Sequence, residues 1–64
     1  MFKTKEEAVN YATDKVKTFR DSLDGIEVWS LPNKTFDVNH TMNSNGRNWL
    51  VQNKATKLQT IYRK

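Results

Sequence analysis

Apolar positions in the first third of the chain recur with the spacing of an α-helix. They are separated by steps of three and four residues, at Ala8/Val9, Ala12, Val16, Phe19 and Leu23. Such steps place the side chains on one stripe of a helix. Thr4 and Glu7 have the spacing of a capping box, and Asp24-Gly25 is typical of a helix end. The pattern predicts a helix over about residues 5–24.

After Gly25 the apolar positions change to a period of two, which indicates strands. We predict strands at about residues 26–31, 35–42, 47–52 and 57–63. A three-residue loop, Pro32-Asn33-Lys34, would join the first two strands and pair Val28 with Val38. Asn45-Gly46 predicts a type I′ turn between the second and third strands, because that turn needs positive φ at both central residues.

These elements predict an α+β domain over residues 1–64, in which one N-terminal helix packs on a four-stranded antiparallel meander. The helix covers one face of the sheet. The core predicted between the two layers is Val9, Ala12, Val16, Phe19, Leu23, Val28, Phe36, Val38, Trp49 and Val51.

Four large apolar residues do not belong to that face. Counted along the predicted strands, they point to the face that the helix leaves open, at Trp29, Leu31, Leu50 and Ile61. An exposed tryptophan is a frequent interface anchor because it buries a large, rigid area. We therefore predict a protein interface at these four residues, with a second copy of the chain in a homodimer or with a larger protein. The last strand lacks proline, so its edge offers another route to association.

The charge is distributed unevenly. The chain has a formal net charge of +4, five basic and five acidic residues precede Gly25, and no acid follows Asp37. An acidic partner is consistent with such asymmetry. The alternative hypothesis is therefore nucleic-acid binding, in which cations reach phosphates and amides read base edges. The residues predicted for it are Asn48, Gln52, Lys57, Gln59 and Arg63.

The sequence offers little chemistry for catalysis. It contains no cysteine, and His40 is the only histidine, with no second strong metal ligand on its side of the predicted strand. We therefore expect no catalytic residues, no metal, no cofactor and no small-molecule substrate, and hence no enzyme. No apolar run exceeds three residues, so we expect neither a membrane span nor a signal peptide, and a cytoplasmic location.

The chain is short, cysteine-free and rich in Lys, Asn and Thr. In this composition it resembles the small uncharacterised proteins encoded by phages and prophages of Gram-positive bacteria. The resemblance implies expression inside a bacterial host cell, and often a role in binding a host or phage macromolecule.

Overall fold

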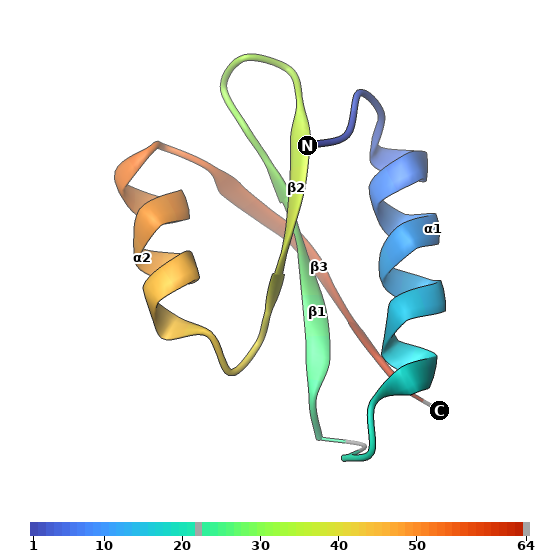
Figure 1. Ribbon diagram of the computed structural model, residues 1–64. Coiled ribbons are helices and arrows are strands. Elements are labelled where there is room, and N and C mark those ends of the chain that lie inside the picture. The colour runs from blue at the N-terminus through green and yellow to red at the C-terminus, as the bar shows by residue number, and fades with distance from the viewer. Residues whose placement is uncertain (22, 64) are drawn as a thin grey trace.

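The computed structural model describes residues 1–21 and 23–63 and has an α+β fold (Figure 1). Its elements in chain order are helix α1 (Lys5–Lys15), a 3₁₀ turn (Val16–Thr18), strands β1 (Gly25–Ser30) and β2 (Phe36–His40), helix α2 (Ser44–Gln52) and strand β3 (Thr56–Tyr62). The three strands form an antiparallel sheet in the order β2-β1-β3. Figure 1 shows the sheet between the two helices, with α1 on one face and α2 on the other.

The predicted α+β class and N-terminal helix are confirmed, whereas the four-stranded meander is wrong. Residues 47–52, predicted as the third strand, lie in α2. The chain passes from β2 through α2 and returns on the far side of β1, so that β3 pairs with β1. β1 is therefore the central strand, and β2 and β3 are the two edges.

Helix α1 begins where the capping box predicts. Thr4 Oγ1 accepts a hydrogen bond from the Glu7 backbone N–H at 3.1 Å, which satisfies one of the free donors of the first turn. Glu6 and Glu7 also place negative charge near the positive end of the helix dipole.

The predicted helix end at residues 24–25 is wrong, because the chain leaves the helical path after the 3₁₀ turn. Asp21 Oδ1 accepts a hydrogen bond from Leu23 N–H at 2.9 Å, and this local turn competes with further helix. Leu23, predicted in the core, is consequently exposed. Gly25 has no positive φ and begins β1 instead of ending a helix. Ser22, inside the predicted helix, lies outside the described residues.

The hairpin of β1 and β2 has the predicted register, with Val28 opposite Val38. In the loop, Lys34 N–H donates to Leu31 O at 3.1 Å, and Pro32 supplies the fixed φ that this turn favours. Lys34 closes the loop with a φ of 68°. The odd-length loop thus keeps the apolar residues of both strands on one face, as predicted.

Asn45-Gly46 does not form the predicted hairpin turn, because both residues lie in the first turn of α2. Asn43 Oδ1 accepts a hydrogen bond from Gly46 N–H at 3.1 Å and so caps the helix. The dipeptide suits a type I′ turn only if φ is positive, and no glycine in the described residues has a positive φ.

Helix α2 ends in a Schellman motif with lysine in the position that usually holds glycine. Lys54 has a φ of 62°, its N–H donates to Val51 O at 3.0 Å, and Ala55 N–H donates to Leu50 O at 2.9 Å. Ala55 also packs on the cluster that contains Leu50, which is the apolar contact expected of this motif.

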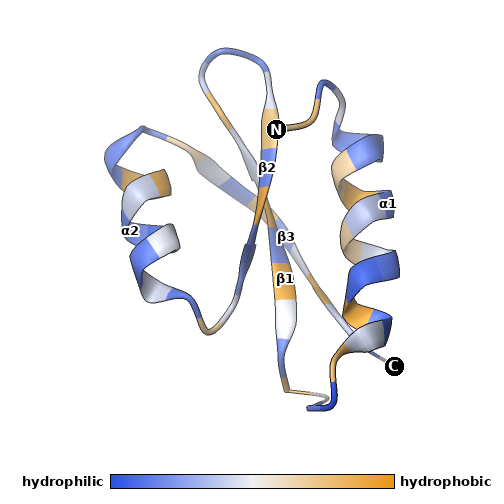
Figure 2. Cartoon of the chain, viewed as in Figure 1, coloured by the Kyte–Doolittle hydropathy of each residue, from blue (hydrophilic) through white to orange (hydrophobic). Residues whose placement is uncertain are grey.

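Two separate apolar clusters hold the helices to the sheet. The α1 cluster consists of Ala8, Ala12, Val16, Ile26 and Val28, with Phe2, Val9, Phe19, Phe36, Val38 and Ile61 packed around it. The α2 cluster, on the opposite face, consists of Trp29, Leu31 and Leu50, with Ala55 packed against it. In Figure 2 apolar (orange) and polar (blue) segments alternate along α1, as expected of a helix with one buried stripe.

The predicted core is right for the α1 side apart from Leu23, and wrong for residues 49 and 51. Trp49 is 51 % exposed and Val51 is also exposed. Because this segment is helical, one residue between them faces the sheet, and that residue is Leu50.

Candidate binding edge and groove

The face predicted to be an open protein interface is covered by α2. Trp29, Leu31 and Leu50 are buried together, and Trp29 is only 5 % exposed. Ile61 lies on the other face, opposite Ile26 and against the α1 cluster, because β3 pairs with β1. The prediction that these four residues form an exposed surface is therefore wrong, and the surplus tryptophan belongs to a second core.

A buried carboxylate organises this second core. Glu27 is 3 % exposed on β1, and its Oε1 accepts hydrogen bonds from Trp29 Nε1 and from Asn39 Nδ2, each at 3.2 Å. Its Oε2 forms an ion pair with Arg47 Nε of α2 at 3.3 Å. Arg47 also donates to the Thr41 carbonyl. We call these five residues the Glu27 network, and it ties α2 to both β1 and β2.

Gly46 allows α2 to approach β2 closely. A Cβ atom at this position would overlap Asn39 Oδ1 and would lie 2.8 Å from Asn43 Nδ2. Asn39 has little freedom to move, because its Nδ2 donates to Glu27 and to the Asn43 carbonyl. Gly46 is thus required by packing rather than by a left-handed backbone.

The two edges of the sheet differ in what covers them. On the β2 side, Phe2 N–H donates to Phe36 O and Phe36 N–H donates to Phe2 O, both at 2.8 Å. On the β3 side, residues 1–21 and 23–63 provide no backbone partner other than β1. β2 is thus bridged at Phe36, and beyond it Val38 N–H donates to Asp37 Oδ1 and Asn43 N–H donates to His40 O. The outer edge of β3 has no such backbone partner among the described residues.

The Phe2 bridge fixes the direction of the backbone groups in β2, in β1 and, beyond the register shift, in the end of β3. Phe36 directs its N–H and C=O away from β1, so its partner Ser30 directs its own toward β3. Backbone groups alternate along a strand, so Ile26 also faces β3 and forms a hydrogen-bonded pair with Ile61. Their β3 neighbours, Thr60 and Tyr62, must then direct their N–H and C=O groups outward.

Not all of β3 is equally suited to pairing. The register against β1 shifts between Val28 and Trp29, which leaves Leu58 as an extra residue in a β-bulge. Bulges and lysines are common devices that protect edges, and Lys57 lies directly beside this bulge. The regular part of the edge is therefore Gln59–Tyr62.

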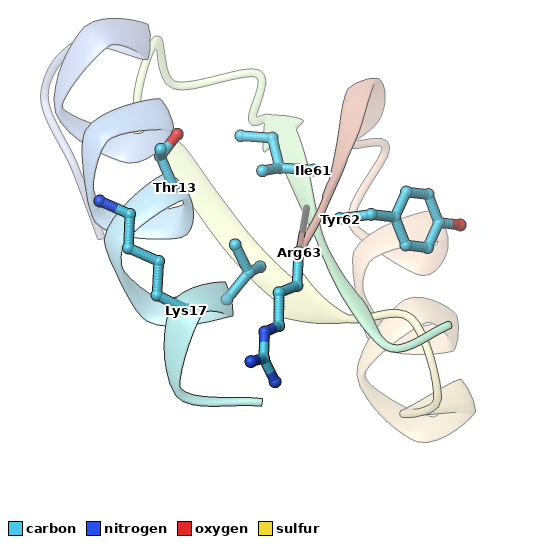
Figure 3. Close-up of a pocket in the computed structure, with 6 residues that line it drawn as sticks. Thr13, Lys17, Ile61, Tyr62 and Arg63 are labelled. Carbon is cyan, nitrogen blue, oxygen red and sulfur yellow. The ribbon is translucent and has the colours of Figure 1, made fainter. Parts of the chain in front are cut away.

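A groove runs between α1 and the end of β3 (Figure 3). Its volume is about 560 Å³, within the range of small-ligand pockets. Its lining residues are Thr13 of α1, Val16 and Lys17 of the 3₁₀ turn that follows it, Ile61 and Tyr62 of β3, and Arg63. Figure 3 shows Thr13 and Lys17 on the helix side and Ile61 and Arg63 on the strand side, while the Tyr62 ring points away from the helix.

The groove has an apolar floor and two cations. Val16 is buried and Ile61 is half-buried, so both contribute apolar surface at the bottom. Lys17 and Arg63 are exposed on opposite sides, and Arg63 donates to the Phe19 carbonyl, which holds its guanidinium beside the 3₁₀ turn. Among the described lining residues there is no acid to neutralise these two charges.

The five residues predicted for nucleic-acid binding are not gathered on one face. Asn48 and Gln52 are exposed on α2. On β3, Lys57 opposes Trp29 on the α2 side, whereas Gln59 opposes Val28 on the α1 side. Arg63 follows β3 and lies in the groove beside α1. Three of the five residues, Lys57, Gln59 and Arg63, thus lie along β3 and its continuation, but not all on one face.

Comparison with known proteins adds no relative, since no family model, curated protein or solved structure matches the chain. Within residues 1–21 and 23–63, no helix is long and apolar enough to cross a membrane. Over the same ranges, no three His, Asp or Glu side chains are grouped as they would be around a metal ion.

Proposed function

We propose that the protein is a small non-enzymatic interaction module that binds another polypeptide by strand addition to the outer edge of β3. The observation that carries this proposal is the difference between the edges: Phe2 pairs with β2, and β3 has no outer partner among the described residues. An added strand gains affinity from main-chain hydrogen bonds and specificity from pockets for alternate side chains.

The backbone geometry supports this mode of binding. Thr60 and Tyr62 each offer an outward N–H and C=O, which allows a partner strand to make up to four hydrogen bonds there. The segment has neither proline nor glycine, so it is a regular template. Lys57 and the bulge at Leu58 restrict pairing to the end near Arg63 and so oppose indiscriminate stacking.

The partner in this proposal is a second copy of the chain or a larger protein. The interface is the β3 edge rather than the face of Trp29, which α2 covers. Nucleic-acid binding stays a prediction from charge alone, since its five residues are divided between α2 and β3. Steep loss of binding with salt would be its signature, because counterions are released when cations contact phosphates.

One pair of variants tests strand addition. Thr60→Pro removes an outward N–H without removing a hydrogen bond to β1, whereas Thr60→Val keeps that N–H and alters the side chain alone. The probe is a phage-displayed library of random nine-residue peptides, selected on the immobilised full chain, with amide NMR shifts to locate the bound peptides. We expect shifts at Gln59–Tyr62, binding retained by Thr60→Val and binding lost in Thr60→Pro.

The control for this test is the fold of each variant. Both should melt cooperatively with a circular dichroism spectrum like that of the wild type. If selected peptides shift residues elsewhere, or bind Thr60→Pro as well as they bind Thr60→Val, strand addition at β3 is refuted.

A further inference from the structure

The groove beside β3 lies where the side chains of an added strand would point. Strands in a sheet are about 4.8 Å apart, and directly opposed residues point to the same face. A partner residue opposite Ile61 would therefore point to the α1 side of the sheet, over the floor that Val16 and Ile61 form. This position suits an apolar side chain, because it would cover the Ile61 side chain, which is now half-buried.

The next position on the same face meets positive charge. Side chains two residues apart on a strand share a face, so the partner residue opposite Arg63 would also lie on the α1 side. It would lie near the Arg63 guanidinium, with Lys17 of the 3₁₀ turn across the groove. A carboxylate at this position would neutralise two cations that have no acidic neighbour in the groove lining.

We propose that the groove and the β3 edge together bind an extended acidic segment of another protein, with an apolar residue opposite Ile61 and Asp or Glu opposite Arg63. This inference rests on the proposed strand addition at β3 and names the chemistry of its partner. A second copy of the chain does not fit that chemistry, because its own β3 carries Lys57 and is followed by Arg63. The chain also has a net charge of +4, so two copies repel each other.

The experiment uses the same peptide library and the full chain. We expect the enriched peptides to share an apolar residue with Asp or Glu two positions away. A synthetic peptide with Glu at that position should bind about three- to tenfold more tightly than its matched Gln version, the range expected for one carboxylate near two partly exposed cations. Raising the salt concentration from 0.05 to 0.5 M should reduce this preference.

Charge reversal on the protein identifies the site. Lys17→Glu should abolish the preference for Glu over Gln, and so should Arg63→Glu. Lys3→Glu changes the net charge equally but lies outside the groove lining, so the preference should persist. Because the Lys17 side chain is exposed and makes no hydrogen bond with the described residues, its replacement provides a test even if Arg63→Glu disturbs the contact with Phe19.

The outcomes separate this inference from the proposed function. Equal affinity for the Glu and Gln peptides overturns the acidic partner. The same conclusion follows if Lys17→Glu and Lys3→Glu show the same preference for the Glu peptide over the Gln peptide. If such peptides still change the amide NMR shifts of Gln59–Tyr62 and still need the Thr60 N–H, strand addition stands without an acidic partner. If no selected peptide changes the amide NMR shifts of β3, both strand addition and the acidic partner are refuted. A mass that doubles with concentration, with Gln59–Tyr62 at the contact, makes a second copy the occupant and also overturns the acidic partner.

Discussion

The two faces of the sheet are covered in different ways. The α1 face is closed by apolar side chains, with Ala8 and Ala12 allowing the helix to lie close to Ile26 and Val28. The α2 face has a smaller apolar cluster with a buried charge beside it. Glu27 accepts hydrogen bonds from Trp29 and Asn39 on the sheet, and it forms an ion pair with Arg47 of α2. Where apolar area is small, directional bonds determine how a helix docks, since each buried polar group must find its partner.

The two tryptophans give the largest expected contrast between a buried and an exposed site on the α2 side. Trp29→Ala should lower the free energy of unfolding by about 3–5 kcal/mol, because it empties the second core. Trp49→Ala removes a side chain that is half in solvent and should cost less than about 1 kcal/mol. Urea denaturation of both variants measures these changes. Equal losses would show that α2 is not docked on Trp29.

Removal of the buried charge tests whether polar bonds hold α2. Glu27→Ala should cost about 3 kcal/mol, because it leaves Arg47 without its partner and the Trp29 and Asn39 donors unsatisfied. Glu27→Gln keeps an acceptor oxygen and should cost less, about 1–2 kcal/mol. Glu6→Ala, an exposed control on α1, should change stability by at most about 0.5 kcal/mol. A Glu27→Ala variant as stable as this control would refute the Glu27 network.

The contact between α2 and β2 is tested by adding one methyl group. Gly46→Ala would gain about 1 kcal/mol from helix propensity alone. We expect a net loss of about 1–3 kcal/mol instead, because the new Cβ overlaps the Asn39 side chain. Asn45→Ala in the same turn is exposed and should stay within about 0.5 kcal/mol of wild type. Thermal melts of the two variants decide, and a stabilised Gly46→Ala would mean that α2 lies farther from β2.

The smallest effect concerns the end of α2. Lys54→Gly should raise stability by about 0.5–1 kcal/mol, because a φ of 62° is strained for lysine and natural for glycine. Lys34→Gly in the β1–β2 loop, at a φ of 68°, should show a similar gain that owes nothing to α2. Denaturant midpoints measure both, and a loss of stability in Lys54→Gly alone would contradict the Schellman motif.

The features that could be predicted from the sequence depend on local signals and on the spacing of apolar residues within one element. The start of α1 followed from Thr4 and Glu7, and the β1–β2 register followed from the odd-length loop and the alternation of Val28 and Val38. In each case neighbouring residues carry the information, so no knowledge of distant contacts was needed.

The prediction for the second half of the chain is wrong because the local signals there permit two structures. Asn45-Gly46 fits a hairpin turn and also the first turn of a helix capped by Asn43. The choice depends on Leu50 meeting Trp29 and on Arg47 meeting Glu27, and both are contacts distant in sequence. A signal was nonetheless present: Trp29 on β1 and Leu31 just after it form an apolar pair that α1 could not cover, which implies a further covering element.

The candidate site was predicted only in part. The last strand is an edge as predicted, although the predicted strand order that made it one is wrong, and the basic character of the C-terminal part followed from a count of charges. The groove could not be foreseen, because it depends on β3 pairing with β1 and thereby lying beside Lys17 of the 3₁₀ turn. Strand order is set by α2 and its docking, which periodicity alone does not reveal.

Hydrogen exchange of the two indole N–H groups tests most directly whether α2 closes the face of Trp29 and so removes Trp29 from the surface open to partners. Two indole signals are expected in an ¹⁵N-labelled sample, and Trp49→Phe assigns them. After transfer to D₂O, the Trp29 signal should persist, because its N–H is buried and donates to Glu27, while the half-exposed Trp49 signal should vanish first. Equally rapid loss of both signals would contradict the account and return Trp29 to an open face.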